Sequence, residues 1–257
     1  MNQRVVHFAV LVLMVFQAGI SLLFPVYLDQ GWIQDTWFGN DLVTLFIVCP
    51  LFLFSLLQRT SFFKLVRNGC LGYVLYNYAF YALGTEINTL FLVYVLLISL
   101  AGISLIQVFS TEAESRVAWN YFDAEKNYIL PGVIFIIIGI GLGSVWTGSW
   151  IAHSFFNGKL PVETAAFRLV AVLDLVIIVN MMLISGIALL RKKMIGFIFG
   201  PIIGIQGSLY LLILAVNSML VSINQHTVSG ELPVWGTLFA VTLAGTVSLL
   251  VSGRKKD

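Results

Sequence analysis

The stretch that decides the fold is NDLVTLFIVCPLFLFSLLQR, residues 40–59, in which an acidic residue opens a long apolar run that ends at an arginine. A second stretch of this form, DLVIIVNMMLISGIALLR, covers residues 174–191. In both, the acid precedes the arginine by 17 or 18 residues. At the helical rise per residue this is about 26 Å, close to the hydrocarbon thickness of a bilayer. We therefore expect two transmembrane helices, with Asp41 and Asp174 near one membrane face and Arg59 and Arg191 near the other.

The composition extends this interpretation to the whole chain. Of its 257 residues, 59% are hydrophobic and 10% are charged, and the mean hydropathy is +0.97. Soluble domains carry about 25% charged residues, so the lipid bilayer is the expected surrounding. We predict an all-α polytopic membrane protein that forms one transmembrane domain, 1–257. Its eight transmembrane helices are expected at about 5–24, 41–57, 65–83, 87–109, 131–151, 165–190, from 195 onward, and at 234–251.

The basic residues predict the orientation. Cytoplasmic loops of membrane proteins are enriched in lysine and arginine. With a cytoplasmic amino terminus, twelve of the fourteen Lys and Arg residues are inside, and only Lys159 and Arg168 are outside. We expect a multi-pass protein of the plasma membrane, in bacteria the inner membrane, with both termini cytoplasmic. Five tryptophans then fall near the outer face as an interfacial belt: Trp32, Trp37, Trp146, Trp150 and Trp235.

An internal repeat is a further expectation. Pro25-Val26 precedes Asp41 much as Pro161-Val162 precedes Asp174, and glycine-bearing runs follow both basic turns. Two tandem four-helix halves, 1–110 and 129–252, would share one orientation and be related by an axis along the membrane normal. A cytoplasmic amphipathic segment, 111–128, would link them. The alternative is that Leu- and Val-rich runs match by composition alone.

Small residues and prolines indicate how the helices pack. Gly139 and Gly143 have the GxxxG spacing that lets two membrane helices approach closely. Pro50 and the pair Gly200-Pro201 lie inside apolar runs, where they predict irregular backbone. Such backbone is tolerated in a membrane only where it faces protein or a water-filled cavity.

Polar residues inside the spans are the candidate binding residues. An ionisable side chain within a membrane is costly, which favours a functional role for Asp174 and Asp41. The alternative is that Asp174 only marks the interface and that Asp41, with Asn40, caps a helix. Amides in the spans also serve helix packing. The polar residues of the predicted spans all fall in the middle or the outer half of the membrane. We therefore predict an outward-facing polar pocket formed by Asp41, Asp174, Asn77, Tyr81, Gln206, Gln17 and Asn217.

These observations favour a small transporter or permease that binds a cation, a proton or a small polar solute. The alternatives are a non-catalytic membrane subunit or receptor-like module, with an oligomer or partner subunit, and a membrane-embedded lipid-modifying enzyme. No catalytic motif, cofactor motif or clustered set of metal ligands is present in the sequence, and the net charge of +2 does not indicate nucleic-acid binding. His153 and His226, with Glu163 and Glu231, leave a surface zinc site as a weaker alternative. Two carboxylates sharing a site, as in an aspartyl enzyme, would require Asp41 and Asp174 to meet.

Overall fold

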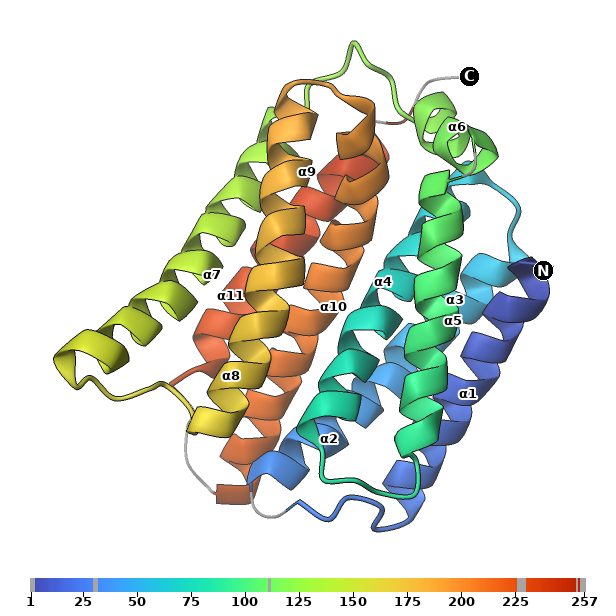
Figure 1. Cartoon of the computed structure of the whole chain (residues 1–257). Helices are drawn as coiled ribbons and strands as arrows, with labels where there is room; N and C mark the ends of the chain where they lie inside the picture. The colour runs from blue at the N-terminus through green and yellow to red at the C-terminus, as the bar shows by residue number, and fades with distance from the viewer. Residues whose placement is uncertain (1–2, 30–31, 111, 226–229, 253, 255–257) are drawn as a thin grey trace.

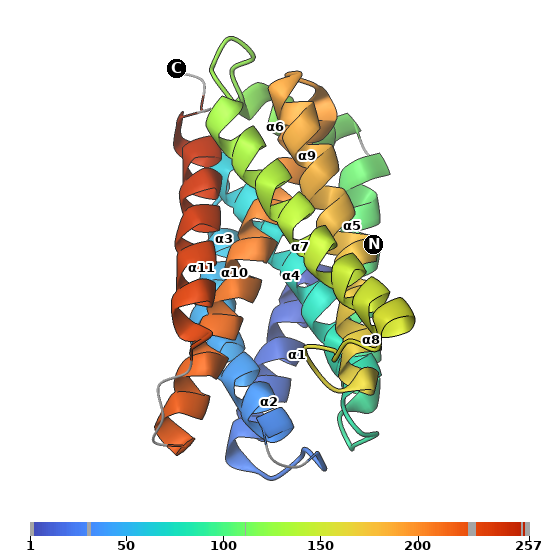
Figure 2. The same ribbon diagram turned by 90° about the vertical axis from the view of Figure 1, so that its left-hand side faces the viewer.

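The computed structural model describes residues 3–29, 32–110, 112–225, 230–252 and 254, and over these residues the protein is an all-helical bundle. Long helices run up and down side by side, and the short helix α6 lies across one end (Figures 1 and 2). Seven helical segments are long and apolar enough to cross a membrane: Gln3–Leu23, Thr36–Leu57, Phe91–Ser110, Ile129–Phe156, Ala166–Leu190, Met194–Asn224 and Leu232–Val251. The prediction of a multi-pass helical membrane protein is confirmed at this level.

The helices follow the chain in two successive groups. The first group consists of α1 (Gln3–Leu23), α2 (Trp32–Val43), η1 (Thr44–Val48), α3 (Cys49–Leu57), α4 (Ser61–Gly84) and α5 (Phe91–Ser110), followed by α6 (Glu112–Tyr121). The second consists of α7 (Ile129–Phe156), α8 (Thr164–Leu173), η2 (Asp174–Val179), α9 (Asn180–Leu190), α10 (Met194–Gln225), α11 (Leu232–Val247) and η3 (Ser248–Ser252). The segments labelled η are π-helical.

The two ends of the bundle differ in charge. The end that carries α6 also carries the turns after α3 and α9, where Arg59 and residues 191–193 lie (top of Figure 1). We call it the basic end. The opposite end carries the connections after α1, α4, α7 and α10. Lys159, in the connection after α7, and Arg168, in α8, lie toward this opposite end.

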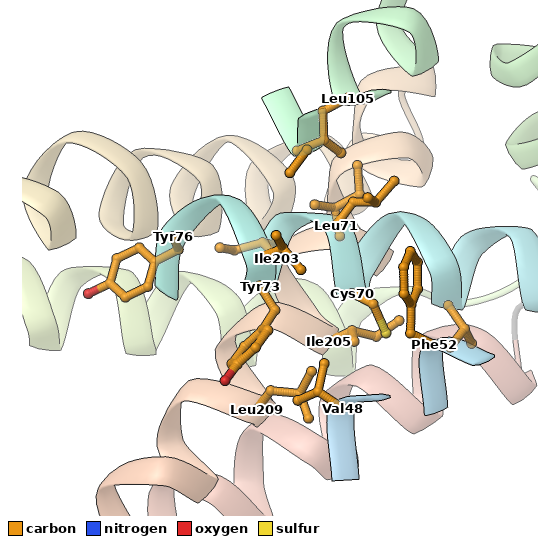
Figure 3. Close-up of a cluster of buried hydrophobic side chains, with 14 of the residues drawn as sticks. Val48, Phe52, Cys70, Leu71, Tyr73, Tyr76, Leu105, Ile203, Ile205 and Leu209 are labelled. Carbon is orange, nitrogen blue, oxygen red and sulfur yellow. The ribbon is translucent and has the colours of Figure 1, made fainter. Parts of the chain in front are cut away.

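Helices α4 and α10 run in the same direction through the middle of the bundle and pack on each other (Figure 1). Two glycines of α4 allow the close contact: a methyl group on Gly69 would lie 2.5 Å from Cβ of Ile205, and one on Gly72 would lie 2.9 Å from Cγ2 of Ile202. Around this contact, side chains of α4 fill the space between α3, α5 and α10 (Figure 3). More than half of the residues of α4 are buried in protein, Asn68 and Asn77 among them.

π-helical turns interrupt the helices of both deciding stretches. Helix α2 continues through η1 into α3, and α8 continues through η2 into α9. Pro50, which has no N–H to donate, is the second residue of α3, so the irregular backbone expected near this proline is present as a π-helical turn. In the second stretch, Nδ2 of Asn180 donates to the carbonyl oxygens of Leu175 and Val176 at 2.9 and 3.1 Å. By contrast, α10 continues through Pro201.

One boundary prediction is wrong. The second helix begins at Trp32 and not at Asp41, so residues 32–40 are helical and Asn40 and Asp41 are not its caps. Trp37 draws this part of the chain into a helix, because its ring packs against Phe80 and Tyr81 at centroid distances of 5.0 Å. The start at Trp32 puts Asp41 inside a candidate span, Thr36–Leu57, and Asp174 lies inside Ala166–Leu190.

The tryptophan belt is also only partly as expected. Trp37 is buried, and Trp146 is part-buried with its ring nitrogen bonded to Asp174. The indole nitrogen of Trp37 donates to Asp29, in the connection after α1, at 3.0 Å. Trp150 remains half exposed, and the side chain of Trp32 lies outside the described part of the chain.

The glycine pair in α7 does bring two helices together. A methyl group on Gly139 would lie 3.1 Å from Leu183, and one on Gly143 would lie 3.3 Å from Val179. Nearer the basic end, a methyl group on Gly186 would lie 2.7 Å from the carbonyl oxygen of Gly132. The close approach predicted from the GxxxG spacing is confirmed.

The predicted linking segment contains the helix α6, which packs against the ends of both groups of helices. Past its end, the ring of Phe122 stacks on Phe197 of α10 at 5.2 Å. The hydroxyl of Tyr121 donates to the carbonyl oxygen of Leu250 at 2.6 Å. The segment thus holds the carboxyl-terminal helix to the rest of the basic end.

Candidate functional site

Asp41 is the centre of a polar cluster inside the first group of helices. Its side chain is fully buried, and it accepts hydrogen bonds from the Tyr27 hydroxyl at 2.6 Å, the Tyr81 hydroxyl at 2.8 Å and Nε2 of Gln17 at 3.1 Å. All three donors are uncharged. A buried carboxylate without an ion pair depends on such donors, because moving a charge out of water is costly.

Gln17 connects this cluster to further residues of the same group. Its Nε2 also lies 3.0 Å from the Ser21 hydroxyl and 3.1 Å from the Tyr27 hydroxyl, so its two hydrogens are shared among several acceptors. Its Oε1 accepts from the Tyr78 hydroxyl at 2.8 Å. Asp41 is therefore fixed by α1, α4 and the segment between α1 and α2, all of which belong to the first group.

Next to Asp41 along the chain, Asn40 begins a row of amides. Nδ2 of Asn40 lies 3.5 Å from Oδ1 of Asn77, and Nδ2 of Asn217 donates to Oδ1 of Asn40 at 3.3 Å. Gly39 makes room for this contact, since a methyl group there would lie 1.9 Å from Oδ1 of Asn217. The row joins α2, α4 and α10, so it crosses between the two groups of helices.

Asp174 has different surroundings. It is fully buried at the first residue of η2. The Tyr76 hydroxyl of α4 donates to its Oδ1, and the indole nitrogen of Trp146 in α7 donates to its Oδ2 at 2.8 Å. Tyr76 in turn packs edge-on against Tyr210 of α10 at 5.0 Å. One of the two donors thus comes from the first group of helices and the other from the second.

Three amides of the candidate set keep a buried atom without a hydrogen-bond partner: Nδ2 of Asn77, Nε2 of Gln206 and Oδ1 of Asn217. Their side chains are 3%, 2% and 8% exposed. Gln206 lies against Gly72, whose added methyl group would be 3.0 Å from Oε1. Buried polar groups are almost always paired, so these three atoms are available to a small polar ligand or to water.

Hydrogen bonds bring five of the seven predicted residues into two sets, and the other two residues belong to neither. Gln17, Asp41 and Tyr81 meet directly, Asn77 and Asn217 meet through Asn40, and Asp174 and Gln206 stand apart. No donor among the described residues serves both aspartates, which argues against a shared-proton arrangement. Sequence reasoning missed Tyr27, Asn40, Tyr76, Tyr78 and Trp146. The signal in the sequence for three of them is the tyrosine-rich run at residues 73–81 and Tyr27, since a tyrosine hydroxyl buried in a membrane helix bundle needs a hydrogen-bond partner.

Two shallow hollows are described, both at the basic end. One, of about 330 Å³, lies between residues 125–129 and Leu189, Leu190 and Lys192, and the other, of about 370 Å³, lies beside residues 60–63, Asn120, Tyr121 and Arg254. Neither borders an aspartate of the candidate site. Within the described ranges, no three His, Cys, Asp or Glu side chains lie close enough to hold a metal ion. His226, half of the zinc alternative, is outside those ranges.

Comparison of the chain with protein-family models, with curated proteins and with solved structures found no match.

Proposed function

We propose that this protein is a small permease of the plasma membrane that moves a cation, a proton or a small polar solute between its two groups of helices. One observation carries the proposal: two aspartates are fully buried and accept hydrogen bonds from uncharged donors alone. Asp41 lies about 14 Å along the helix from Trp32, and Asp174 lies about 15 Å along the helix from Thr164; both helices start at the opposite end of the bundle. Carboxylates at such depth are expensive in a membrane and mark ion or substrate pathways in many transporters.

The row of amides gives the pathway a second component. Asn40, Asn77 and Asn217 lie where α2, α4 and α10 meet, and two of them retain an unpaired polar atom. A polar solute that both donates and accepts hydrogen bonds would satisfy those atoms. The close fit of Gly39 against Asn217 means that binding would require the helices to separate, as they do in alternating access.

Helix α4 is the proposed eighth span. It is 24 residues long, enough to cross the hydrocarbon, and it runs beside α10 through the bundle. Its polar residues are supported by the protein that surrounds it and so need not meet lipid. Eight spans place both termini on one side, which the basic residues identify as cytoplasmic. In this orientation the basic end is inside and the opposite end faces outward.

This topology can be tested by labelling. Single cysteines at Asn157 and Glu125, in a background without Cys49 and Cys70, are treated with a membrane-impermeant thiol reagent on intact cells. Asn157→Cys should react from outside, and Glu125→Cys should react only after permeabilisation. Reaction of both from one side would reject the eight-span arrangement.

We also propose that the two groups are tandem repeats related by an axis along the membrane normal. The α4–α10 contact supports this. Asp41 and Asp174 are 133 residues apart, and the same offset relates Gly69 to Ile202 and Gly72 to Ile205. The repeat therefore relates the observed contact of Gly69 with Ile205 to the observed contact of Ile202 with Gly72. Such reciprocal pairs are typical of a two-fold interface. In addition, each aspartate accepts a hydrogen bond from the first helix of its own group, Gln17 in one case and Trp146 in the other.

Flux measurements test the permease. Purified protein is reconstituted in liposomes that contain a pH-sensitive dye, and sodium, potassium and methylammonium are applied in turn with and without a membrane potential. We expect dye signals above empty liposomes, and loss of the signal in Asp174→Asn. Glu163→Gln, an exposed carboxyl at the opposite end, is the matched control and should keep the wild-type rate. Equal rates in the wild type and in Asp174→Asn would contradict the proposal.

A second candidate is a non-catalytic membrane subunit, favoured by the free face of α7. The last turns of this helix leave the bundle (Figure 1), and Trp150, Phe155 and Phe156 are exposed there. On the same helix nothing lies within 4 Å of a methyl group placed on Gly141 or Gly148. A partner that co-purifies in fixed stoichiometry, and is lost in Gly148→Leu, would support this role in place of transport.

A further inference from the structure

The two aspartates bind donors of different origin, and this difference is the basis for assigning them different roles. The donors to Asp41 are Gln17, Tyr27 and Tyr81, which all belong to the first group of helices. The donors to Asp174 are Trp146 from its own group and Tyr76 from the other. Loss of the carboxylate charge at Asp41 would change contacts within one group. The same loss at Asp174 would change a contact between the groups.

The geometry points to Asp174 as the proton-binding site of the proposed permease, with Tyr76 as the residue through which proton binding loosens the contact between the two groups of helices. This inference rests on the proposed function for its purpose, but the site and its effect on the helices can be tested without any transport. Asp41, in this scheme, holds the first group together and takes no part in coupling.

The chemistry around Asp174 selects a proton over a metal cation. Alkali and alkaline-earth cations are held by several oxygen ligands that direct lone pairs at the ion. Around Asp174, one carboxylate oxygen faces an indole N–H, which has a hydrogen to donate and no lone pair to offer. The other faces a tyrosine hydroxyl that also donates. Two donors pointing at the carboxylate leave space for a small added proton but not for a coordinated metal ion.

The proton also has a specific consequence at Tyr76. When a proton from solvent bonds to Oδ1 of Asp174, the carboxyl group becomes neutral and gains an O–H that can donate. The indole of Trp146 cannot accept it, whereas the tyrosine oxygen can, so the hydrogen bond with Tyr76 reverses. The charge-assisted bond between the groups is replaced by a neutral one, which is roughly half as strong. The freed hydroxyl hydrogen of Tyr76 can then turn toward Tyr210, whose ring lies 5.0 Å away.

Few polar or titratable side chains face Asp174 in the described part of the chain. Helix α4 contributes Tyr76 and α10 contributes Tyr210, while α7 contributes the indole of Trp146. On its own helix, Asn180 is bound to backbone carbonyls and Arg168 is exposed. The carboxylate of Asp174 is therefore the group of this part of the bundle that a proton would bind.

Infrared difference spectroscopy tests the site directly. Wild-type protein in liposomes is titrated from alkaline to acidic pH, and the carbonyl band of a protonated carboxyl group is followed. We expect a band that is absent in Asp174→Asn, is shifted in frequency in Tyr76→Phe, and is unchanged in Tyr73→Phe. Tyr73 is a matched control because it is also buried on α4 but its hydroxyl pairs with Thr44 within the first group. Should Asp174→Asn fail to fold, the contrast between the two tyrosine variants still decides the assignment.

Distances between spin labels test the loosening. Labels at Glu86→Cys and Glu163→Cys, exposed positions in the first and second groups, report the separation of the groups at the opposite end. Acid should shift the distance distribution of wild type and of Tyr73→Phe, whereas Tyr76→Phe should give the acid distribution at every pH. The inference is overturned if the band persists in Asp174→Asn, if the labels do not respond to acid, or if sodium at constant alkaline pH produces the shift. Titration and movement in a protein that carries no flux would instead reject the permease and leave the proton site standing.

Discussion

Asp41 and Asp174 lie nine and ten residues after the starts of their helices, and both are fully buried, yet the bonds around them differ in number and origin. Asp41 accepts from three side chains of one group of helices, and Asp174 accepts from two side chains, one in each group. Two aspartates at similar positions along their helices can therefore have hydrogen-bond donors of different origin. A carboxylate fixed within one group stabilises that group, whereas one bound across the interface can respond to movement between groups.

The packing of the two groups differs in the same sense. In the first, α1 is joined to its neighbours by the polar network around Gln17. In the second, α7 meets α9 through glycines, so that the backbones of the two helices nearly touch at Gly132 and Gly186. Hydrogen bonds between side chains therefore join the helices of the first group, and close dispersion contacts at glycines join α7 and α9 of the second.

The largest expected effect is on the stability of aspartate variants. Asp41→Ala removes three buried hydrogen bonds and Asp174→Ala removes two. At roughly 0.6–1.7 kcal/mol for each hydrogen bond within a membrane protein, the free energy of unfolding should fall by about 2–5 kcal/mol for Asp41→Ala and about 1–3 kcal/mol for Asp174→Ala. Unfolding by sodium dodecyl sulfate in mixed micelles measures both. A larger loss in Asp174→Ala would reverse the assignment of roles.

How much of this could be read from the sequence depends on the length scale of each feature. The all-helical, membrane-spanning class follows from long apolar runs, and the close contact at Gly139 follows from local spacing. The start of the second helix at Trp32 does not, because it depends on the packing of Trp37 against α4, which is distant in the sequence. The same holds for the partners of the aspartates: Asp174 and Tyr76 are 98 residues apart, and no local pattern relates them.

The glycine contact of the second group should give an intermediate effect. In Gly186→Leu, the new side chain meets the carbonyl oxygen of Gly132 at 2.7 Å and Ile136 at the same distance, so α7 and α9 must separate. Overpacking of this kind costs typically 1–3 kcal/mol. Gly141→Leu is the control, because a methyl group there meets nothing within 4 Å. The same unfolding titration compares the two, and equal stability would mean that the glycine contact does not hold α7 in place.

The smallest expected effects concern the interface between the two groups, where the proposed axis predicts equal losses of stability at two glycines. Gly69→Ala and Gly72→Ala each place a methyl group against an isoleucine of α10, at 2.5 Å from Ile205 and 2.9 Å from Ile202. Overpacking costs about 1–3 kcal/mol, but alanine gains about 1 kcal/mol over glycine in a helix, so each variant should lose only about 1 kcal/mol. If the axis relates the two contacts, the losses should agree within about 0.5 kcal/mol, the precision to which independent sites usually add.

Ile205→Ala should rescue Gly69→Ala but not Gly72→Ala, since each isoleucine meets a different glycine. Gly102→Ala on α5, where the nearest atom is Leu75 at 3.8 Å, should be neutral or stabilising and so calibrates the helix-propensity gain. A loss confined to one of the two α4 glycines, or a rescue of both by Ile205→Ala, would show that the α4–α10 contact is not built by repeat symmetry.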